Sequence, residues 1–389
     1  MHHGALPHLW TTTRRSLGRV VLFALPLLAL DVGCGGSAYV QVRSARELKT
    51  TEAASGLEQV TRSADQELAP SVSPDGKLLA YEVHPRSSDA TETLVVAPIA
   101  RPSAPRFHID GGIQPTWLAD SSGVVFVTQN DGHWQTLRRD VNAPTVGALL
   151  VPVGDPAHNA LWPSLSPDGN GLVTSLLALG VFDAHEMRKR TFDAALNVTT
   201  LAGYGVNGLL GDGIEPAWSP NGNTLAIIRS EGGHGHVFLE PATPPPARVA
   251  KAKAAANDDS NAAAEEAERQ KEKTRARQLT EGPDEDAQPT WSPDGRFIAF
   301  CSAHASDDGT MGNEANLFVV GADGTGLTQL TEGDVFACKP SWGKNGWIYF
   351  DADSGDGFHI WRVRYETYRA LDKNEDAVGG GASDVADAS

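Results

Sequence analysis

Six copies of one short turn sequence recur along the chain, and this repeat limits the possible folds more than any other feature. The leading prolines of the copies are 45, 48, 53, 73 and 51 residues apart. The copies read Pro70-Ser-Val-Ser-Pro-Asp-Gly76, Pro115-Thr-Trp-Leu-Ala-Asp-Ser121, Pro163-Ser-Leu-Ser-Pro-Asp-Gly169, Pro216-Ala-Trp-Ser-Pro-Asn-Gly222, Pro289-Thr-Trp-Ser-Pro-Asp-Gly295 and Pro340-Ser-Trp-Gly-Lys-Asn-Gly346. A period of about 40–50 residues is typical of repeated small sheets, none of which buries its faces alone. The sequence therefore predicts an all-β fold with the sheets arranged in a ring.

Each copy predicts a β-hairpin. In Pro-Asp-Gly, proline presets φ, aspartate bonds to the local backbone, and glycine takes the left-handed position that closes the turn. An apolar run such as Phe297-Ile-Ala-Phe300 follows each turn, as expected for a second strand. The residue two after the leading proline is large, and the residue one after it is small. Because neighbouring residues of a strand face opposite ways, the large set is predicted to fill the space between sheets. The large set is Val72, Trp117, Leu165, Trp218, Trp291 and Trp342, and the small set is Ser71, Thr116, Ser164, Ala217, Thr290 and Ser341.

A short segment near the start of the chain predicts how the ring closes. Gln278-Leu-Thr280 and Gln329-Leu-Thr331 are candidate fourth strands, and Gln59-Val-Thr61 resembles them but precedes every hairpin. No comparable segment follows Arg362. We therefore expect a six-bladed β-propeller of four-stranded blades, closed by an N-terminal strand that completes the last blade.

The core Pro-x-Trp-Ser-Pro-Asp-Gly-x-x-Ile-Ala-Phe, together with Gln-Leu-Thr-x-Gly, resembles the WD-like propeller repeat of the TolB family over about residues 57 to 366. The resemblance implies a propeller that binds other proteins of the bacterial envelope, as TolB-like propellers do in the Tol–Pal system. The second and sixth copies depart from the repeat, with Ala119-Asp-Ser121 and Lys344-Asn-Gly346 in place of Pro-Asp-Gly. The chain has no room between residues 34 and 57 for the N-terminal α/β domain of TolB.

The N-terminus predicts export. Arg14, Arg15 and Arg19 precede the apolar run Val20–Leu30, which is too short to span a bilayer and fits a signal peptide. Cys34 follows Val32-Gly33 and resembles the lipidated cysteine of a bacterial lipobox, although Asp31 stands where an aliphatic residue is usual. We expect a signal peptide over 1–33 and lipid attachment at Cys34, with ordinary signal cleavage or an uncleaved anchor as alternatives. The protein is then a lipoprotein of the bacterial cell envelope, facing the periplasm or the outside.

Composition divides the remaining chain. We expect a lipidated tether over 34–56, the propeller over 57–368, and an acidic disordered tail over 369–389. The segment 241–277 is rich in alanine, lysine, glutamate and arginine without an apolar stripe, so it is expected to be a solvated insertion on the rim. Two further cysteines, Cys301 and Cys338, lie on neighbouring blades, where they form either a disulfide or two buried thiols.

Charge and motifs limit the function. The net charge of −17 argues against nucleic acid and anionic membrane surfaces, and is compatible with a cationic partner. The sequence has no Gly-x-Ser-x-Gly elbow, no His-Glu-x-x-His and no Cys-x-x-Cys, so no cofactor is expected. We expect a monomeric propeller that touches the membrane only through its lipid.

The residues just before the leading prolines are the candidate binding site. They differ between copies and are predicted to ring the mouth of the propeller channel, with Ala69 at the first position. The predicted partner-binding residues are Gln114, Trp162, Glu215, Gln288 and Lys339. The favoured function is a non-enzymatic envelope scaffold that engages a protein or peptide. The alternative is a metal-dependent lyase or lactonase that acts on carbohydrates or lactones and uses His84 and His304.

Overall fold

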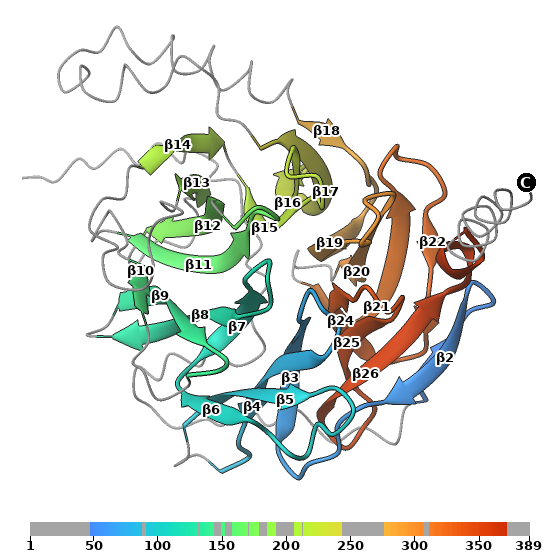
Figure 1. Ribbon diagram of the computed structural model, residues 1–389. Helices are drawn as coiled ribbons and strands as arrows, with labels where there is room; N and C mark the ends of the chain where they lie inside the picture. The colour runs from blue at the N-terminus through green and yellow to red at the C-terminus, as the bar shows by residue number, and fades with distance from the viewer. Residues whose placement is uncertain are drawn as a thin grey trace, which may run out of the picture.

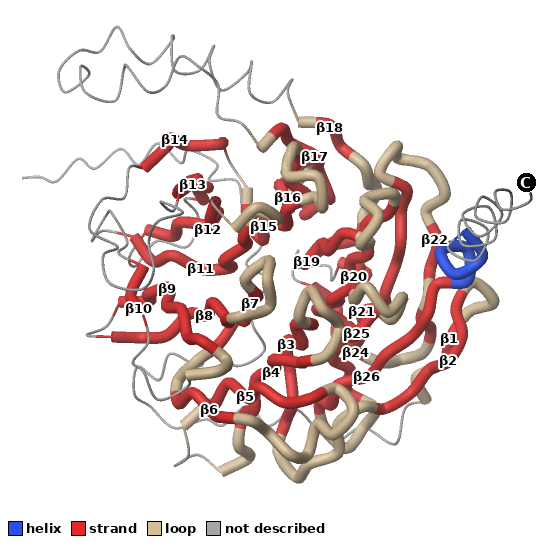
Figure 2. The backbone as a smooth tube through the Cα atoms, in the orientation of Figure 1, coloured by secondary structure: helices blue, strands red, loops and turns tan. Residues whose placement is uncertain are grey.

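Strands arranged around a central axis make up nearly all of the fold (Figure 1). The structure is a computed structural model, and it describes residues 47–87, 91–130, 133–143, 149–151, 158–169, 171–178, 185–191, 206–211, 213–242, 276–305 and 311–371. Figure 2 shows the strands in successive small sheets joined by tight turns. This is the all-β propeller architecture that the repeat predicted.

Each repeat forms one antiparallel sheet, called a blade here and numbered along the chain. Blade one has β3 (Gln66–Val72), β4 (Leu78–His84), β5 (Thr93–Pro98) and β6 (Phe107–Asp110). Blade two has β7 (Ile113–Trp117), β8 (Gly123–Asn130), β9 (His133–Asp140) and β10 (Leu149–Val151). Blade three has β11 (His158–Leu165), β12 (Gly171–Ala178), β13 (His185–Thr191) and β14 (Val206–Gly211). Blade four has β15 (Ile214–Trp218), β16 (Thr224–Glu231), β17 (His234–Pro241) and β18 (Arg277–Gln278).

The last two blades are linked. Blade five has β19 (Asp284–Trp291), β20 (Phe297–Ala305), β21 (Met311–Gly321) and β22 (Thr328–Gln329). Blade six has β24 (Phe336–Trp342), β25 (Ile348–Asp353), β26 (Phe358–Tyr365) and β2 (Ala54–Gln59). One parallel pair, Ala315 with Phe336, joins β21 to β24, so these two blades form one continuous sheet.

The repeated turn has the geometry that its residues predicted. In the first copy, Gly76 N–H donates to the Ser73 carbonyl at 2.8 Å, and the Ser73 hydroxyl accepts Leu78 N–H at 2.9 Å. Asp75 accepts Lys77 N–H at 3.1 Å. Gly76 has φ 71°, and Ser121, which replaces glycine in the second copy, has φ 62°. The turn is therefore explained by local hydrogen bonds and backbone conformation.

The large residues after the leading prolines lie between the blades, as expected. Trp117, Trp218 and Trp291 are each less than 10% exposed. Each indole N–H also donates to a backbone carbonyl of the preceding blade, at 2.9 Å, 3.1 Å and 3.0 Å respectively. The tryptophans thus join the blades by hydrogen bonds as well as by packing, which alternation alone does not reveal.

The N-terminal strand completes the last blade. β2 pairs antiparallel with β26, and in Figure 1 the first described strands lie beside the last. Thr61, which is 4% exposed, accepts Ile360 N–H through its hydroxyl at 2.9 Å, and Val60 N–H donates to the Ile360 carbonyl at 2.7 Å. The pairing follows the prediction made from Gln59-Val-Thr61.

The described N-terminal strands begin before the expected propeller boundary at residue 57. β1 (Lys49–Thr50) pairs with β23 (Thr331–Glu332) at the outer side of blade five, and β2 starts at Ala54. The boundary differs because composition does not mark a two-residue strand. Cys34, the signal peptide, residues 243–275 of the expected insertion and residues 372–389 of the tail lie outside the described residues.

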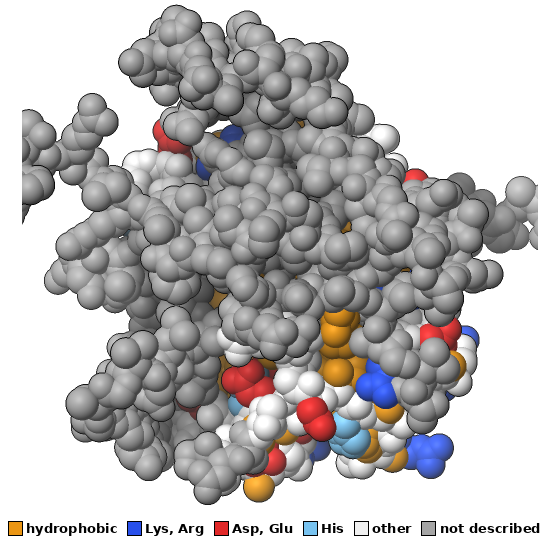
Figure 3. Space-filling model, turned by 90° about the vertical axis from the view of Figure 1, so that its left-hand side faces the viewer, with side chains coloured by type: hydrophobic (Ala, Val, Ile, Leu, Met, Phe, Trp, Pro, Cys, Tyr) orange, Lys and Arg blue, Asp and Glu red, His pale blue; other side chains and the backbone are white. Residues whose placement is uncertain are grey.

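The side view of Figure 3 shows acidic, histidine, basic and hydrophobic side chains where described residues are visible. Leu327, at 57% exposure, is the large apolar residue that stands out among the described ones. No helix in the described ranges is long and apolar enough to cross a bilayer.

Candidate functional site

The six residues before the leading prolines share an uncommon backbone conformation. Each has a positive φ, between 48° and 54°, although none is glycine. In every blade the pairing of the first two strands shifts register at this point. Left-handed conformations are rare for residues with a side chain and persist where the surroundings enforce them. We call these residues, Ala69, Gln114, Trp162, Glu215, Gln288 and Lys339, the central ring.

A side chain of the preceding blade fixes each of these residues. The backbone N–H of every central-ring residue donates to a side-chain oxygen across the blade boundary. The six pairs are Ala69 with Asp351 at 2.8 Å, Gln114 with Glu82 at 2.7 Å, Trp162 with Gln114 at 2.7 Å, Glu215 with Ser175 at 3.2 Å, Gln288 with Glu215 at 2.7 Å and Lys339 with Gln288 at 3.0 Å. Hydrogen bonds therefore run from each blade to the next around the whole ring.

Every blade supplies one acceptor, from one of two positions. In blades two, four and five the acceptor is the side chain of the central-ring residue itself: Gln114, Glu215 and Gln288. Ala69, Trp162 and Lys339 have no side-chain oxygen. Their blades use the second strand instead, through Glu82, Ser175 and Asp351.

The second-strand position was missed by the sequence reasoning, although a signal for it exists. It lies 13 residues after the central-ring residue, or 12 in blade six. In the three blades that do not use it, this position carries Val127, Ile228 and Cys301. Comparing the two positions copy by copy shows one acceptor in every pair, which is the pattern that could have identified Glu82, Ser175 and Asp351.

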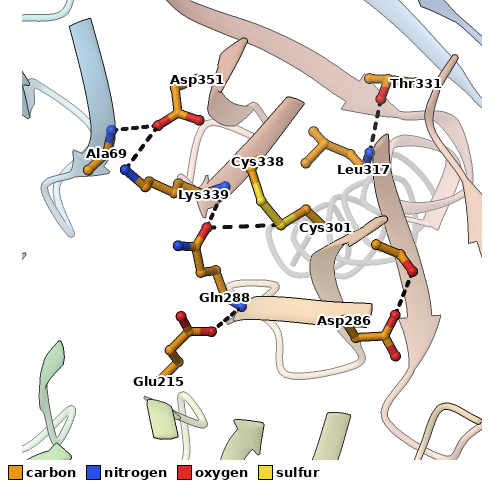
Figure 4. Close-up of a disulfide and its surroundings, with 11 residues drawn as sticks. Ala69, Glu215, Asp286, Gln288, Cys301, Leu317, Thr331, Cys338, Lys339 and Asp351 are labelled. Carbon is orange, nitrogen blue, oxygen red and sulfur yellow. Dashed lines mark hydrogen bonds and ion pairs between the residues drawn. A yellow bond between two sulfur atoms is a disulfide. The ribbon is translucent and has the colours of Figure 1, made fainter. Parts of the chain in front are cut away.

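Figure 4 shows half of the ring, from Glu215 through Gln288 and Lys339 to Asp351 and Ala69. Glu215 is 4% exposed, and the other predicted partner-binding residues are half-buried. The structure therefore brings all five predicted residues into one ring and gives three of their side chains a bond to the next blade. Trp162 and Lys339 take part through their backbone, which leaves their side chains for other contacts.

Buried charges surround Lys339. Its Nζ lies 3.6 Å from Asp351 Oδ2, and Asp351 and Glu82 are each 1% exposed. Burial raises the pKa of Asp351, against the opposing effects of Lys339 and of Ala69 N–H. Burial also raises the pKa of Glu215 to about 7, although Gln288 N–H and the charge of Lys339 favour its ionised form. For Glu82, burial is outweighed by the His84 hydrogen bond and the charge of Lys339, so its pKa is lowered.

Two ring side chains have polar atoms without a partner. Glu215 Oε1 and Gln114 Nε2 are buried and make no hydrogen bond. The remaining polar atom of each side chain, Glu215 Oε2 or Gln114 Oε1, accepts a backbone N–H from the next blade, which fixes the orientation of the side chain. A buried polar atom without a partner is unfavourable by about 1–3 kcal/mol. These atoms are therefore where a bound group gains most by supplying hydrogen bonds.

His84 and His304, the two histidines of the enzymatic alternative, each contact carboxylates of their own blade and do not meet each other. His84 Nε2 is 2.8 Å from Glu82, and its Nδ1 is 3.2 Å from Glu92. Burial disfavours its protonation, but these two carboxylates outweigh burial and raise the pKa of His84 to about 9. His304 is exposed and lies 2.7 Å from Asp284. Among the described residues, no group of three or more histidine, cysteine or acidic side chains is arranged to bind a metal.

Cys301 and Cys338 form a disulfide between blades five and six, with Cα atoms 5.0 Å apart. The sequence left a bridge and two thiols open, and the structure has the bridge. Figure 4 places it beside Gln288 and Lys339, so a covalent bond reinforces this boundary next to its ring hydrogen bond.

Comparisons with known proteins find similar solved structures only at low sequence identity. No protein-family model matches the chain, and no curated protein is similar to it in sequence. The chain is similar to the structure of a putative TolB from Agrobacterium tumefaciens, with 15% identity, 79% of this chain and 96% of that chain covered, and a TM-score of 0.49.

Two further structures are similar to it. TolB from Acinetobacter baumannii has 16% identity, with 75% of this chain and 66% of that chain covered, and a TM-score of 0.47. An oligogalacturonate lyase from Vibrio parahaemolyticus has 11% identity, with 82% and 97% covered, and a TM-score of 0.46. These comparisons assign no family and no activity to the chain.

Proposed function

We propose that this protein is a non-enzymatic binding scaffold of the bacterial envelope that engages a protein or peptide partner at the central ring. The observation that carries the proposal is the pair of buried, partnerless atoms, Glu215 Oε1 and Gln114 Nε2. They are an acceptor and a donor on blades four and two, and Trp162 of blade three lies between these blades in the ring. A partner that meets all three gains two hydrogen bonds and an apolar contact.

The positions of the other ring side chains support binding over catalysis. Lys339 is paired with Asp351, and His84 is paired with two carboxylates, so neither is a free base. Glu215, Gln288 and Gln114 use one oxygen each to join the blades, which makes them rigid. A rigid set of donors and acceptors loses little conformational entropy when a partner binds.

The place of action follows from the N-terminal sequence. A lipid on Cys34 anchors the protein to an envelope membrane, and the propeller meets its partner in the periplasm or outside. Labelling cells with a fatty-acid analogue tests the anchor: the wild-type chain takes up label, and Cys34→Ala does not.

Cross-linking in cells tests the binding function, followed by identification of captured partners from wild type and from Trp162→Ala and Lys339→Gln. Lys344→Gln is the matched control, because it removes the same charge at an exposed turn far along the strand. We expect a partner that is captured by wild type and by Lys344→Gln and lost from the two ring variants. An identical partner list for all four proteins contradicts the central-ring assignment.

A further inference from the structure

The two faces of the propeller differ in charge. Because the strands of each blade are antiparallel, first strands begin where second strands end, as the pairs Gln66 with His84 and Asp284 with His304 show. We call this the strand-start face, and the opposite face, which carries the repeated turns, the turn face. All the exposed charges assigned to a face below belong to residues that the structure describes.

The strand-start face is acidic. Its exposed carboxylates are Glu47, Asp110, Glu231, Glu281, Glu314, Glu332, Asp334 and Asp356. Its exposed cations are Lys49, Arg62 and Arg86. The turn face is balanced by comparison. Its exposed carboxylates are Glu52, Asp75, Asp120, Asp168, Asp294 and Asp323, and its exposed cations are Lys77, Arg101, Arg106, Arg277 and Lys344. The acidity of the chain is therefore concentrated on one face, where a cationic group experiences the stronger attraction.

The central ring continues this charge into the interior. Three buried carboxylates, Glu82, Glu215 and Asp351, face two cations, the ammonium of Lys339 and the protonated ring of His84, which lies 2.8 Å from Glu82. Asp351 is the one nearest to that ammonium, at 3.6 Å, while Glu215 has an oxygen without any partner. With two cations against three carboxylates, one further cation next to Glu215 would balance the charge of this cluster.

Glu215 lies below the strand-start face. Ile214 at the start of β15 pairs with Ile228, and β16 continues three residues further to Glu231, so about 10 Å of strand lies between the start of β15 and that face. Figure 4 shows the Glu215 carboxylate directed toward Gln288 N–H, the Gln288 side chain toward Lys339 N–H, and the Lys339 side chain toward Asp351. Lysine and arginine side chains, with a long apolar stem and a charged head, suit such a path from an acidic surface to a buried carboxylate.

We propose that the strand-start face and the central ring together bind a basic segment of the partner, one lysine or arginine of which places its charged head group against Glu215. This inference rests on the proposed function and names the chemistry of the partner. The surface carboxylates attract the segment, and Glu215 supplies a desolvated ion pair with the oxygen that has no partner in the free protein.

Calorimetric titration with tetralysine amide at low and moderate salt tests the proposal. The surface variant is Asp110→Asn/Glu231→Gln/Glu281→Gln, and its matched control is Ser103→Lys/Ala119→Lys/Leu327→Lys at exposed positions of the turn face. Both raise the net charge by three, so the change in overall charge is matched while the face that carries it differs. Glu215→Gln removes the ring charge and keeps an oxygen for Gln288 N–H. A peptide of acetylated lysines is the neutral probe.

We expect the surface variant and Glu215→Gln each to weaken tetralysine binding about tenfold, which corresponds to about 1.4 kcal/mol. The turn-face control should change binding by less than about threefold, and the acetylated peptide should not bind. If the surface variant and the turn-face control weaken tetralysine binding equally, the attraction comes from overall charge alone and the proposal is overturned. Unchanged tetralysine binding by Glu215→Gln also overturns it.

The cross-linking experiment separates this inference from the proposed function. If the captured partner is lost from Trp162→Ala but retained by the surface variant and Glu215→Gln, the binding function stands and the basic segment is refuted. If tetralysine binds as expected and no partner depends on the ring in cells, the proposed function is refuted while the cation site stands.

Discussion

The alternation of acceptors around the central ring leads to a sharp prediction about blade two. Gln114 Oε1 accepts Trp162 N–H at 2.7 Å, and Gln114→Ala leaves that N–H without its acceptor. The expected loss is the net contribution of one hydrogen bond, about 1 kcal/mol. Val127 occupies the second-strand position of this blade and is fully buried, so Val127→Ser alone is also expected to destabilise the protein, by about 1–2 kcal/mol.

The double variant should lose less stability than the sum of these two effects. In blade three a serine at the corresponding position, Ser175, accepts Glu215 N–H at 3.2 Å. With Gln114→Ala in place, the new hydroxyl at position 127 meets the free Trp162 N–H in the same way. We therefore expect a favourable coupling of about 1 kcal/mol between the two substitutions.

Urea unfolding followed by circular dichroism measures the four free energies of the cycle. Val125→Ser is the matched control, because Val125 is buried on the same face of β8 but pairs opposite Thr116, away from the register shift. Its effect should add to that of Gln114→Ala within about 0.5 kcal/mol. If the effects of Gln114→Ala and Val127→Ser also add within about 0.5 kcal/mol, the idea that either position can supply the acceptor for Trp162 N–H is refuted.

Three more predictions concern stability. The Cys301–Cys338 bridge closes a separation of 37 residues, so reductant should lower the free energy of unfolding by about 4 kcal/mol in wild type and leave the double serine variant unchanged. Glu215 has a raised folded pKa and keeps a proton that the unfolded chain releases, so stability falls as pH rises from about 4.5 to about 7. Glu215→Gln lacks this fall, and unfolding curves at pH 5 and pH 8 should show the variant gaining up to about 3 kcal/mol on wild type; parallel pH profiles contradict it. Thr61→Val removes the acceptor of Ile360 N–H at 2.9 Å and should lower the urea midpoint by an amount equivalent to about 1–2 kcal/mol, whereas an unchanged midpoint shows that β2 does not depend on this bond.

The sequence was sufficient for the features that repeat. The turn residues, the buried tryptophans and the N-terminal partner of β26 follow from comparing one copy with another. Each copy forms the same hairpin and packs against its neighbour in the same way, so it carries similar residues at the same positions. Gln59-Val-Thr61 is the clearest case, since its threonine makes the same bond to a third-strand N–H as Thr280 and Thr331 do, at 2.9 Å each time.

The central ring could be located but not understood from the sequence. Counting residues along a regular pleat predicts a side chain that simply faces the axis. The positive φ at these positions breaks that regularity, and no local residue preference predicts it, because a contact from another blade enforces it. The pairing of Cys301 with Cys338 was left open for the same reason, since the distance between two blades is set by packing across their boundary.

The position of β2 has a consequence for the order in which the protein folds. Thr61 and Ile360 are 299 residues apart, yet they lie in one blade, whereas the first four blades are built from neighbouring segments. The early blades can therefore form while the rest of the chain is still being synthesised, but the last blade forms only when β2 pairs with β26. Until then Ala54–Gln59 is a strand without a partner, and slow closure of such a long loop makes this the vulnerable stage of assembly. A propeller of this kind is completed in a single late event, and chains that stop short of Phe358 remain open.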